Sequence, residues 1–216
     1  MTAREEILAT IRTALHVDAA NPAGSYARIA QTYNRIGQLD HAACLHLFLD
    51  RLIDYDTEIL EVITERELPT AITQALSNSN ETRALIPATF PTTWLPATAT
   101  FIPDHNLSTL AIEGIPAVIT TCEAAVASTG TIILVHQGAQ GRRVLTLLPD
   151  HHICLVRRDQ IFAVLPEALA AIAPPGTSGP ALPITTISGP SATSDIEMTR
   201  IRGVHGPRSL TVILYG

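Results

Sequence analysis

The sequence predicts an α/β fold, a three-layer α/β/α arrangement with a mostly parallel sheet, preceded by N-terminal helices. From residue 58 onward, short strand-type runs alternate with helical stretches. Apolar runs such as TIILV (131–135) and TVILY (211–215) lack alternation between apolar and polar residues, as expected for strands covered on both faces by helices. Apolar residues make up 46% of the 216 residues, enough to bury a core. These patterns predict an α/β domain over residues 58–216 and a helical lead-in over residues 1–57.

The lead-in contains two clear helical patterns. Residues 4–15 place apolar side chains at helical spacing, and a second such pattern covers about 40–54. Between them, the run Asn21-Pro22-Ala23-Gly24 is typical of a break. We expect a further helix over 25–36 that ends at Gly37.

The elements of the domain follow one another in a βαβ rhythm. A strand-type run at 59–64, a helix at about 69–77 with Pro69 in its first turn and a strand at 83–87 form the first unit. The stretch from 87 to 103 contains four prolines, which predicts extended edge segments and turns. After it we expect, in chain order, a strand at 116–120, a short helical piece through Ala127, strand-type runs at 131–135, 144–148 and 151–156, a helix near 164–172, a loop at 174–183, and strands at 184–188 and 211–215.

The charged residues exclude several kinds of function. The formal net charge is −6, from 14 basic and 20 acidic residues, which argues against a nucleic-acid partner held by a basic surface. Every one of these basic residues is an arginine, so Schiff-base chemistry and a phosphate-loop lysine are excluded. The excess of acids lies in residues 1–108, whereas residues 109–216 contain equal numbers of arginines and acids. We therefore expect any anion site in the second half, bound by Arg, backbone amides or helix N-termini.

The three cysteines give no sign of a metal site. Cys44, Cys122 and Cys154 lie too far apart for a CxxC pair, so neither a zinc ribbon, an iron–sulfur cluster nor a disulfide framework is predicted. The sequence identifies no cofactor. The first residues contain no signal-type apolar stretch, and no apolar run approaches the ~20 residues needed to cross a bilayer. A cytoplasmic protein without a membrane partner is therefore expected.

The segment from Ile187 to Glu197 is the strongest candidate for a ligand site. A strand-type run there ends in small hydroxyl residues and enters a predicted helix start, with Ser194 and Glu197 at capping-box spacing and Ser191 as an alternative cap. In open α/β sheets, a helix N-terminus beside the carboxyl end of a strand favours carboxylate or phosphate groups. The segment predicts an anion site, with the alternative that its hydroxyls only cap a helix.

A histidine between two glycines follows in the run GVHGP (203–207). The glycines allow tight backbone geometry, and His205 is suited to act as an acid, a base or an anion partner at neutral pH. Its position shortly after Asp195 and Glu197 favours such a role. The alternative is a surface or structurally satisfied histidine.

Two glycine-bearing loops flank the run at 131–135. Residues 128–131 precede it and residues 138–143 follow it, so that backbone amides and Arg142 are expected to meet at one ligand. The alternative is two plain sheet turns. Glu123 is a candidate nucleophile, yet no Gly-x-Ser-x-Gly elbow surrounds this loop, and no hydrolase triad is predicted.

Two further features receive structural interpretations. His151 and His152 are adjacent in a predicted strand and point to opposite faces, which argues against a shared metal, and one of them is expected at the surface. Trp94 is the only tryptophan and is expected to fill a gap in the core.

Three blocks of the second half carry a family resemblance. The runs TTCEAAVASTGTIIL (120–134), QGRRVLTLLP (140–149) and ISGPSATSDIEMTRIRGVHGP (187–207) resemble, in order and spacing, the LUD domain of LutC-type lactate-utilisation proteins. The resemblance spans about residues 116 to 214. It implies a fold similar to the NagB/RpiA/CoA-transferase group, in agreement with the three-layer prediction.

The resemblance also implies a role in bacterial oxidation of L-lactate to pyruvate, alongside two companion proteins that carry iron–sulfur redox centres. The absence of a cysteine cluster in this sequence fits that division of labour. Where family members often have Glu-Thr-Gly-Thr, this sequence has Ser128-Thr129-Gly130-Thr131. A serine cannot replace a carboxylate nucleophile, which argues against covalent CoA transfer at that position.

Three functions stay open. The leading hypothesis is a component of L-lactate utilisation that binds a small anionic metabolite or cofactor between the 128–142 loops and the 188–206 segment, with a homo-oligomer left open. The second is a transferase or cyclo-ligase-like enzyme acting on an acyl-CoA, phosphate or nucleotide, with Glu123, Glu197 or His205 as catalytic candidates. The third is an assembly subunit whose polar motifs stabilise turns. The predicted ligand-binding residues are Thr129, Gly130, Thr131, Gln140, Gly141, Arg142, Ser188, Gly189, Pro190, Ser191, Asp195, Gly203, His205 and Gly206.

Overall fold

The structure, a computed structural model, describes residues 2–15, 28–30, 32–172, 183–194, 200–203 and 205–216. The chain forms two compact units, Met1–Tyr33 and Asn34–Gly216. In the first unit, helix α1 (Ala3–Leu15) forms where the helical spacing predicts it. The predicted helix over 25–36 is wrong, because residues 28–30 and 32–36 are not helical. These residues are all exposed, so no packed face stabilises a helix there.

The second unit is built on a six-stranded parallel sheet in the order β1-β12-β7-β4-β2-β3. Because every strand runs in the same direction, the amino ends share one edge of the sheet and the carboxyl ends share the other. The predicted α/β class with three layers is confirmed. The strands are β1 (Glu58–Glu61), β2 (Arg83–Pro87), β3 (Thr100–Asp104), β4 (Ala117–Thr121), β7 (His151–Arg157) and β12 (Ser209–Tyr215).

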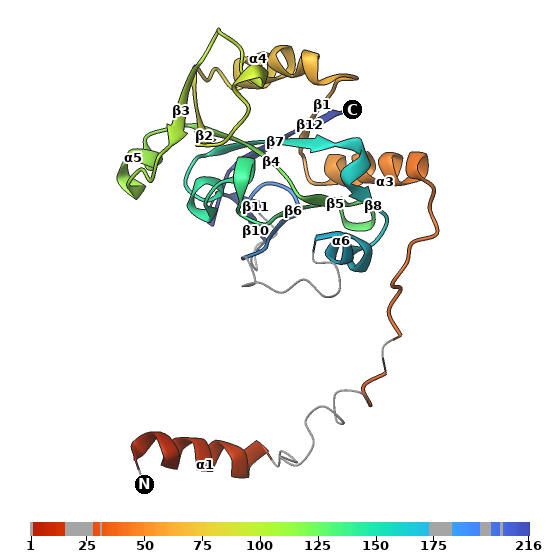
Figure 1. The fold of residues 1–216 in the computed structure, drawn as a ribbon, viewed down its shortest axis with the longest axis vertical. Helices are drawn as coiled ribbons and strands as arrows, with labels where there is room; N and C mark the ends of the chain where they lie inside the picture. Colours follow the sequence, from red (N-terminus) through yellow and green to blue (C-terminus); the bar gives the residue numbers. More distant parts are fainter. Residues whose placement is uncertain (1, 16–27, 31, 173–182, 195–199, 204) are drawn as a thin grey trace. The chain divides into compact units, whose positions relative to one another are not determined.

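Helix α4 (Leu68–Asn78) covers one face of this sheet (Figure 1). Pro69 lies in its first turn, where a missing N–H leaves no hydrogen bond unmade. Ile72 and Leu76 lie at helical spacing and are buried against alternate strand residues, including Ile153 and Ile213. Because side chains alternate along a strand, each central strand contributes to one core on this face and to another on the opposite face.

Helix α3 (His41–Asp54) covers the opposite face (Figure 1). Its start is fixed by Asp40, whose side chain accepts a hydrogen bond of 2.8 Å from the Ala43 N–H. Phe48 and Leu52 are fully buried in the core on this face. Helix α3 therefore belongs to the same compact unit as the sheet, which starts at Asn34. The domain boundary predicted after residue 57 stays a prediction.

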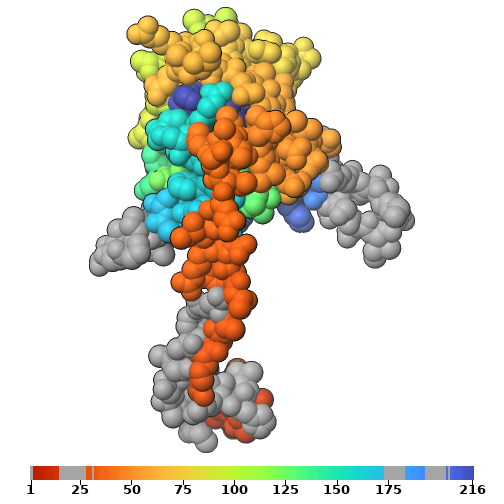
Figure 2. Space-filling view, turned by 90° about the vertical axis from the view of Figure 1, so that its right-hand side faces the viewer, coloured from red at the N-terminus to blue at the C-terminus, as the bar shows by residue number. Residues whose placement is uncertain are grey.

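The stretch from residue 34 to α3 contacts helix α6 (Leu165–Ile172) at Gly37. It is orange in Figure 2 and lies beside the cyan residues near position 160. The Gly37 N–H donates to Glu167 Oε1 at 2.8 Å, and Ala163 leaves no room for a Cβ at Gly37. This contact anchors the approach to α3.

A second, four-stranded sheet lies on the same face as α3, in the order β8-β5-β6-β9. Its β6 runs antiparallel to β5 and to β9. Helix α6 covers it, with Ala168 packed among Val126 and Ile133. The strands are β5 (Ala124–Val126), β6 (Thr131–Leu134), β8 (Ile161–Phe162) and β9 (Thr185–Ile187).

In this region two sequence predictions are wrong, while the strand predicted at 131–135 is confirmed but belongs to the small sheet. The helical piece through Ala127 is wrong, because β5 pairs with β6 and so satisfies its backbone groups in a hairpin. The run at 131–135 forms β6 in the antiparallel sheet; it lacks alternation because Ile133 faces α6 while Ile132 faces the main core. The strand predicted at 144–148 is instead the 3₁₀ helix η5 (Arg143–Thr146), whose Leu145 fills a core beside Leu85.

The predicted helix start at Ser191 is also wrong, because residues 192–194 form a strand; the alternative start at Ser194 places its helix in residues 195–199, which lie outside the described residues. Strands β10 (Ala192–Ser194) and β11 (Arg200–Arg202) pair as an antiparallel hairpin, in which Thr193 is opposite Ile201. Such β-branched residues suit a strand. Asp195 and Glu197 lie outside the described residues. The remaining elements are α5 (Thr109–Glu113) and the 3₁₀ helices η1 (Glu65–Glu67), η2 (Thr92–Trp94), η3 (Ala127–Thr129), η4 (Gly138–Gln140) and η6 (Arg158–Gln160).

Candidate ligand site

A pocket of about 300 Å³ opens at the amino ends of β7 and β12, on the face that α3 covers. His152 and Leu210, the second residues of these strands, form part of its wall. The end of η5, strand β9 and the loops of the two C-terminal motifs form the rest. Six predicted ligand-binding residues line this pocket: Ser188, Gly189, Pro190, Ser191, His205 and Gly206.

The predicted location of this segment at the carboxyl edge of the parallel sheet is wrong. Strand β9, which precedes the Ser188–Ser191 turn, belongs to the small sheet and not to the parallel one. The tendency of ligands to bind at the carboxyl ends of parallel strands therefore does not apply to this turn. It lies beside His152 and Leu210, at the amino edge.

The Ser188–Ser191 turn rests on the end of α3. Gly189 is buried and has φ +83°, a conformation that residues with a Cβ rarely adopt. A Cβ at this position would lie 2.6 Å from the Cβ of Tyr55, which caps the C-terminus of α3. Only glycine lets the turn approach the helix this closely.

A chain of hydroxyl groups links the 128–131 loop to the pocket. Thr129 Oγ1 and Thr131 Oγ1 are 2.7 Å apart, and Thr131 Oγ1 is 2.8 Å from Ser188 Oγ. Gly130 has φ +60° and packs against Arg51 of α3. The predicted loop therefore does not line the pocket but fixes the position of Ser188, which does, through the hydrogen bond to Thr131.

Ser191 joins the two C-terminal motifs. Its N–H donates to the Pro207 carbonyl at 2.8 Å, its carbonyl accepts from the Gly203 N–H at 2.9 Å, and its Oγ accepts from the His205 N–H at 3.2 Å. Gly203 has φ +81°. The runs SGPS and GVHGP, 14 residues apart at the Ser191–His205 contact, thus form one wall.

The described lining of the pocket combines a buried, neutral histidine with exposed polar groups. His152 is buried, its Nε2 is 2.8 Å from Thr120 Oγ1, and burial lowers its pKa to about 3. His152 is therefore neutral at pH 7. The residues that line the described part of the pocket include no Asp, Glu or Arg, so hydroxyls, backbone groups and the exposed His205 face a ligand.

Both His151 and His152 are buried, so the expectation that one of them lies at the surface is wrong. The reason is that β7 is a central strand with both faces covered. On the α4 face, His151 Nδ1 is 2.8 Å from Glu81 Oε2, and its Nε2 is 2.8 Å from Thr211 Oγ1. The two rings point to opposite faces, as predicted.

Four other predicted residues, Glu123, Gln140, Gly141 and Arg142, lie at the carboxyl edge of the parallel sheet. Gln140 Nε2 donates to Glu123 Oε2 at 2.6 Å, immediately after β4, and Gln140 Oε1 accepts from the Val135 N–H. Gly141 has φ +69° and packs against Pro87, the last residue of β2. Glu123 and Gln140 thus lie away from the pocket at the amino edge.

Arg142, which was expected to hold an anion, is engaged by Asp104. Its Nε and Nη2 donate to the two carboxylate oxygens at 2.7 and 2.6 Å, and Nη2 also donates to the Leu107 carbonyl at 3.0 Å. Asp104 is the buried last residue of β3. The hydrogen bonds from Arg142 lower the pKa of Asp104, so this pair is a structural ion pair.

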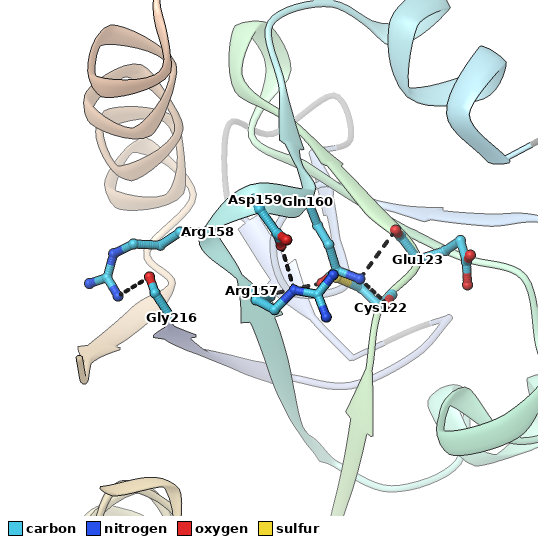
Figure 3. Close-up of polar contacts among 7 residues, drawn as sticks. All are labelled: Cys122, Glu123, Arg157, Arg158, Asp159, Gln160 and Gly216. Atoms are coloured by element: carbon cyan, nitrogen blue, oxygen red, sulfur yellow. Dashed lines mark hydrogen bonds and ion pairs between the residues drawn. The ribbon is translucent and has the colours of Figure 1, made fainter. Parts of the chain in front are cut away.

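A polar network centred on Gln160 connects the carboxyl ends of β4 and β7 (Figure 3). Gln160 Nε2 donates to the Cys122 carbonyl at 3.2 Å and to the Glu123 carbonyl at 3.4 Å. Its Oε1 accepts from the Arg157 N–H at 3.1 Å and from the Cys122 thiol at 3.7 Å. The hydrogen bond with Cys154 and burial raise the pKa of Cys122, which makes its thiol a poor nucleophile.

In the described ranges, no group of three or more His, Cys, Asp or Glu side chains is placed to hold a metal ion. No described helix is both long and apolar enough to cross a bilayer.

Comparison with known proteins decides the family. Residues 110–215 match the LUD domain. The chain is 42% identical over 215 residues to lactate utilization protein C of Deinococcus radiodurans, across 99% of this chain and 96% of that protein. The chain belongs to the LUD-domain family. A crystal structure of a DUF162 family protein from Deinococcus radiodurans is 41% identical to this LUD-domain chain, with a TM-score of 0.70, and the match covers 82% of this chain and 99% of that one.

Two pocket features of this LUD-domain chain were missed from the sequence. Thr185 lines the pocket, and its Oγ1 is 2.6 Å from Nε2 of His136, which follows β6. His136 has φ +55°, an uncommon conformation for a residue with a Cβ. No short motif surrounds His136, and its partner Thr185 is 49 residues away in the sequence. The one hint in the sequence is that His136 follows a predicted strand and precedes Gly138.

Proposed function

We propose that this chain is a component of L-lactate utilisation that binds a small hydroxylated monoanion in the pocket between β9 and the GVHGP loop. The relationship to lactate utilization protein C supports the pathway. The observation that supports binding is that the two C-terminal motifs, remote in sequence, are hydrogen-bonded through Ser191 into the wall of one pocket.

The chemistry of the wall favours a small ligand with few charges. A volume of about 300 Å³ is at the lower end of ligand pockets. Ser188 and Ser191 offer hydroxyls, and His205 is exposed at the rim. A ligand with several phosphates would need guanidinium groups; the described lining of the pocket contains none, and Arg142 is held by Asp104. A monocarboxylate of the size of lactate fits these groups.

The oxidation itself belongs, in this proposal, to companion proteins that carry iron–sulfur centres. This chain would hold or sense the metabolite and present it to them. A homo-oligomer is compatible with this role. The transferase or cyclo-ligase alternative stays a prediction. Two of its candidate catalytic residues lie at different edges of the sheet, because Glu123 is at the carboxyl edge while His205 lines the pocket at the amino edge.

Calorimetric titration with L-lactate, pyruvate, a nucleotide and CoA tests the proposal. Gly206→Leu should abolish binding, because Gly206 lines the pocket and has ordinary space for a Cβ, 3.6 Å from Ser191 Cβ. Ser188→Ala should weaken binding by about fivefold through loss of one hydrogen bond. Ser128→Ala is the matched control, since Ser128 is exposed and outside the pocket lining.

Two outcomes would contradict the proposal. One is that neither L-lactate nor pyruvate binds; the other is that binding persists unchanged in Gly206→Leu. Incubation with acyl-CoA, removal of the free acyl-CoA by gel filtration and then treatment with hydroxylamine checks the transferase alternative separately, because an acyl group that is covalently bound to the protein is then released as a hydroxamate.

A further inference from the structure

We infer that His136 is a positioning residue that makes the pocket select a hydroxyl group over a carbonyl group, by fixing the direction in which the Thr185 hydroxyl donates its hydrogen. The inference rests on the proposed function, namely that a small 2-hydroxy acid occupies the pocket. It assigns the selectivity to two side chains, His136 and Thr185.

The geometry places His136 between a fixed acceptor and the pocket wall. Its Nδ1 is 3.3 Å from the Gly141 carbonyl oxygen, and its Nε2 is 2.6 Å from Thr185 Oγ1. Thr185 is the first residue of β9 and lines the pocket. His136 itself is half-buried at the end of β6.

These two contacts determine the tautomer of the ring. A carbonyl oxygen only accepts hydrogen bonds, so Nδ1 must carry the hydrogen. Burial lowers the pKa of His136, and the nearby positive charge of Arg143 acts in the same direction, so the ring is neutral at pH 7. In a neutral ring with hydrogen on Nδ1, Nε2 is an acceptor. The Thr185 hydroxyl therefore donates to Nε2.

The consequence for a ligand is a choice of group. Because the Thr185 hydroxyl donates its hydrogen bond to His136, Thr185 Oγ1 can only accept a hydrogen bond from a molecule in the pocket. The 2-hydroxyl of L-lactate donates a hydrogen bond to such an oxygen. The 2-oxo group of pyruvate is itself only an acceptor, so it gives no hydrogen bond to the lone pairs of Thr185 Oγ1. We expect L-lactate to bind about tenfold more tightly than pyruvate.

The backbone around His136 is shaped for this arrangement. His136 has φ +55°, which is uncommon for a residue with a Cβ, and Gly141, whose carbonyl faces the ring, has φ +69°, which glycine adopts readily. A Cβ at Gly141 would lie 2.6 Å from Leu145 Cδ1 and 3.0 Å from Pro87 Cγ, so packing holds the carbonyl in place. Strain of this kind persists only where the surrounding structure enforces it.

A first experiment tests the tautomer without any ligand. Nitrogen-15 NMR of the histidine side chains at pH 7.5 distinguishes a ring with hydrogen on Nδ1 from one with hydrogen on Nε2. His136→Asn assigns the signal, and asparagine tolerates the positive φ. We expect His136 as a neutral ring with hydrogen on Nδ1. A ring with hydrogen on Nε2, or a charged ring at this pH, overturns the inference.

A second experiment measures the selectivity by calorimetry with L-lactate and pyruvate. Wild type and His46→Asn, a change at an exposed histidine on α3, should prefer L-lactate by about tenfold. Thr185→Val, which keeps the shape and removes the hydroxyl, should bring the ratio of the two dissociation constants close to one. His136→Asn should do the same.

The outcomes separate the two claims. Equal binding of L-lactate and pyruvate to wild type overturns the role of His136 and leaves the proposed function standing. Binding of neither compound overturns the proposed function, whatever the tautomer. An unchanged preference in Thr185→Val, with wild-type thermal stability, also overturns the inference.

Discussion

Replacing Gly189 by alanine should destabilise the protein through the contact between the pocket turn and helix α3. Gly189 has φ +83°, and its added Cβ would lie 2.6 Å from Tyr55 Cβ and 2.9 Å from Tyr55 Cγ. Both atoms sit close to the backbone of Tyr55, so a rotamer change of its ring cannot relieve the first contact. The turn or the end of α3 has to move.

The magnitude follows from two costs. Placing a residue with a Cβ in the left-handed region costs about 1–2 kcal/mol. Forcing extra volume into a packed contact costs about 1–3 kcal/mol. A loss of about 3 kcal/mol in the free energy of unfolding is therefore expected, which for a chain of this size lowers Tm by about 6–12 °C.

Calorimetric melting of Gly189→Ala beside Gly114→Ala provides the assay. Gly114 ends α5 with φ −81° and has nothing within 4 Å of an added Cβ, so its replacement should change stability by less than about 1 kcal/mol. The reasoning is refuted if the two variants melt within 2 °C of each other, a margin of roughly the experimental error.

Three further predictions concern buried groups. Asp104→Asn should cost about 2 kcal/mol, because Arg142 loses a bidentate partner. In the wild type this contribution is present above the unfolded pKa of about 4 and is lost as pH falls through the lowered pKa of folded Asp104, so urea unfolding of the variant should depend less on pH below about 4. His152 has a folded pKa of about 3, below its unfolded value, so the unfolded chain binds a proton that the folded chain does not; stability should fall as pH drops from 6.5 towards 3, and His152→Gln should flatten urea midpoints measured across that range. Phe48→Ala should cost about 3–5 kcal/mol in denaturant unfolding, because Phe48 is fully buried between α3 and the sheet; a loss below about 1 kcal/mol would contradict this packing.

The fold class could be predicted because periodicity reports burial. The runs that became β2, β4, β7 and β12 are apolar on both faces, and α3 and α4 show one apolar stripe each. Pattern alone did not separate the parallel sheet from the small one. Strand β6 is buried on both faces by α6 and the main core, so it has the same apolar texture as a central parallel strand.

The candidate site was predicted in part. The SGPS and GVHGP runs line one pocket, and their chemistry is local: small hydroxyl residues and glycines at positive φ. The helix start at Ser191 failed because a capping pattern and a hairpin use the same residue types, and pairing with residues 200–202 decided between them.

Long-range partners decided what the sequence did not reveal. The sequence around Arg142 shows no partner for its guanidinium group, whereas in the structure it donates hydrogen bonds to Asp104, which lies 38 residues earlier. His151 is adjacent to His152, and both were buried by the neighbours of β7 in the sheet, which no local pattern displays. His136 depends on Thr185 in the same way.

The position of β12 has a consequence for biosynthesis. Among the described residues, β1 has β12 as its strand neighbour, and β12 stands between β1 and β7. During translation, the backbone of residues 58–61 has no partner until residues 211–214 have been made, and pairing over such a separation in sequence is slow. The nascent chain therefore carries two unpaired strand edges, on β1 and β7, which other chains can join. We therefore expect chaperones to bind the nascent chain late in synthesis, while these strand edges are exposed.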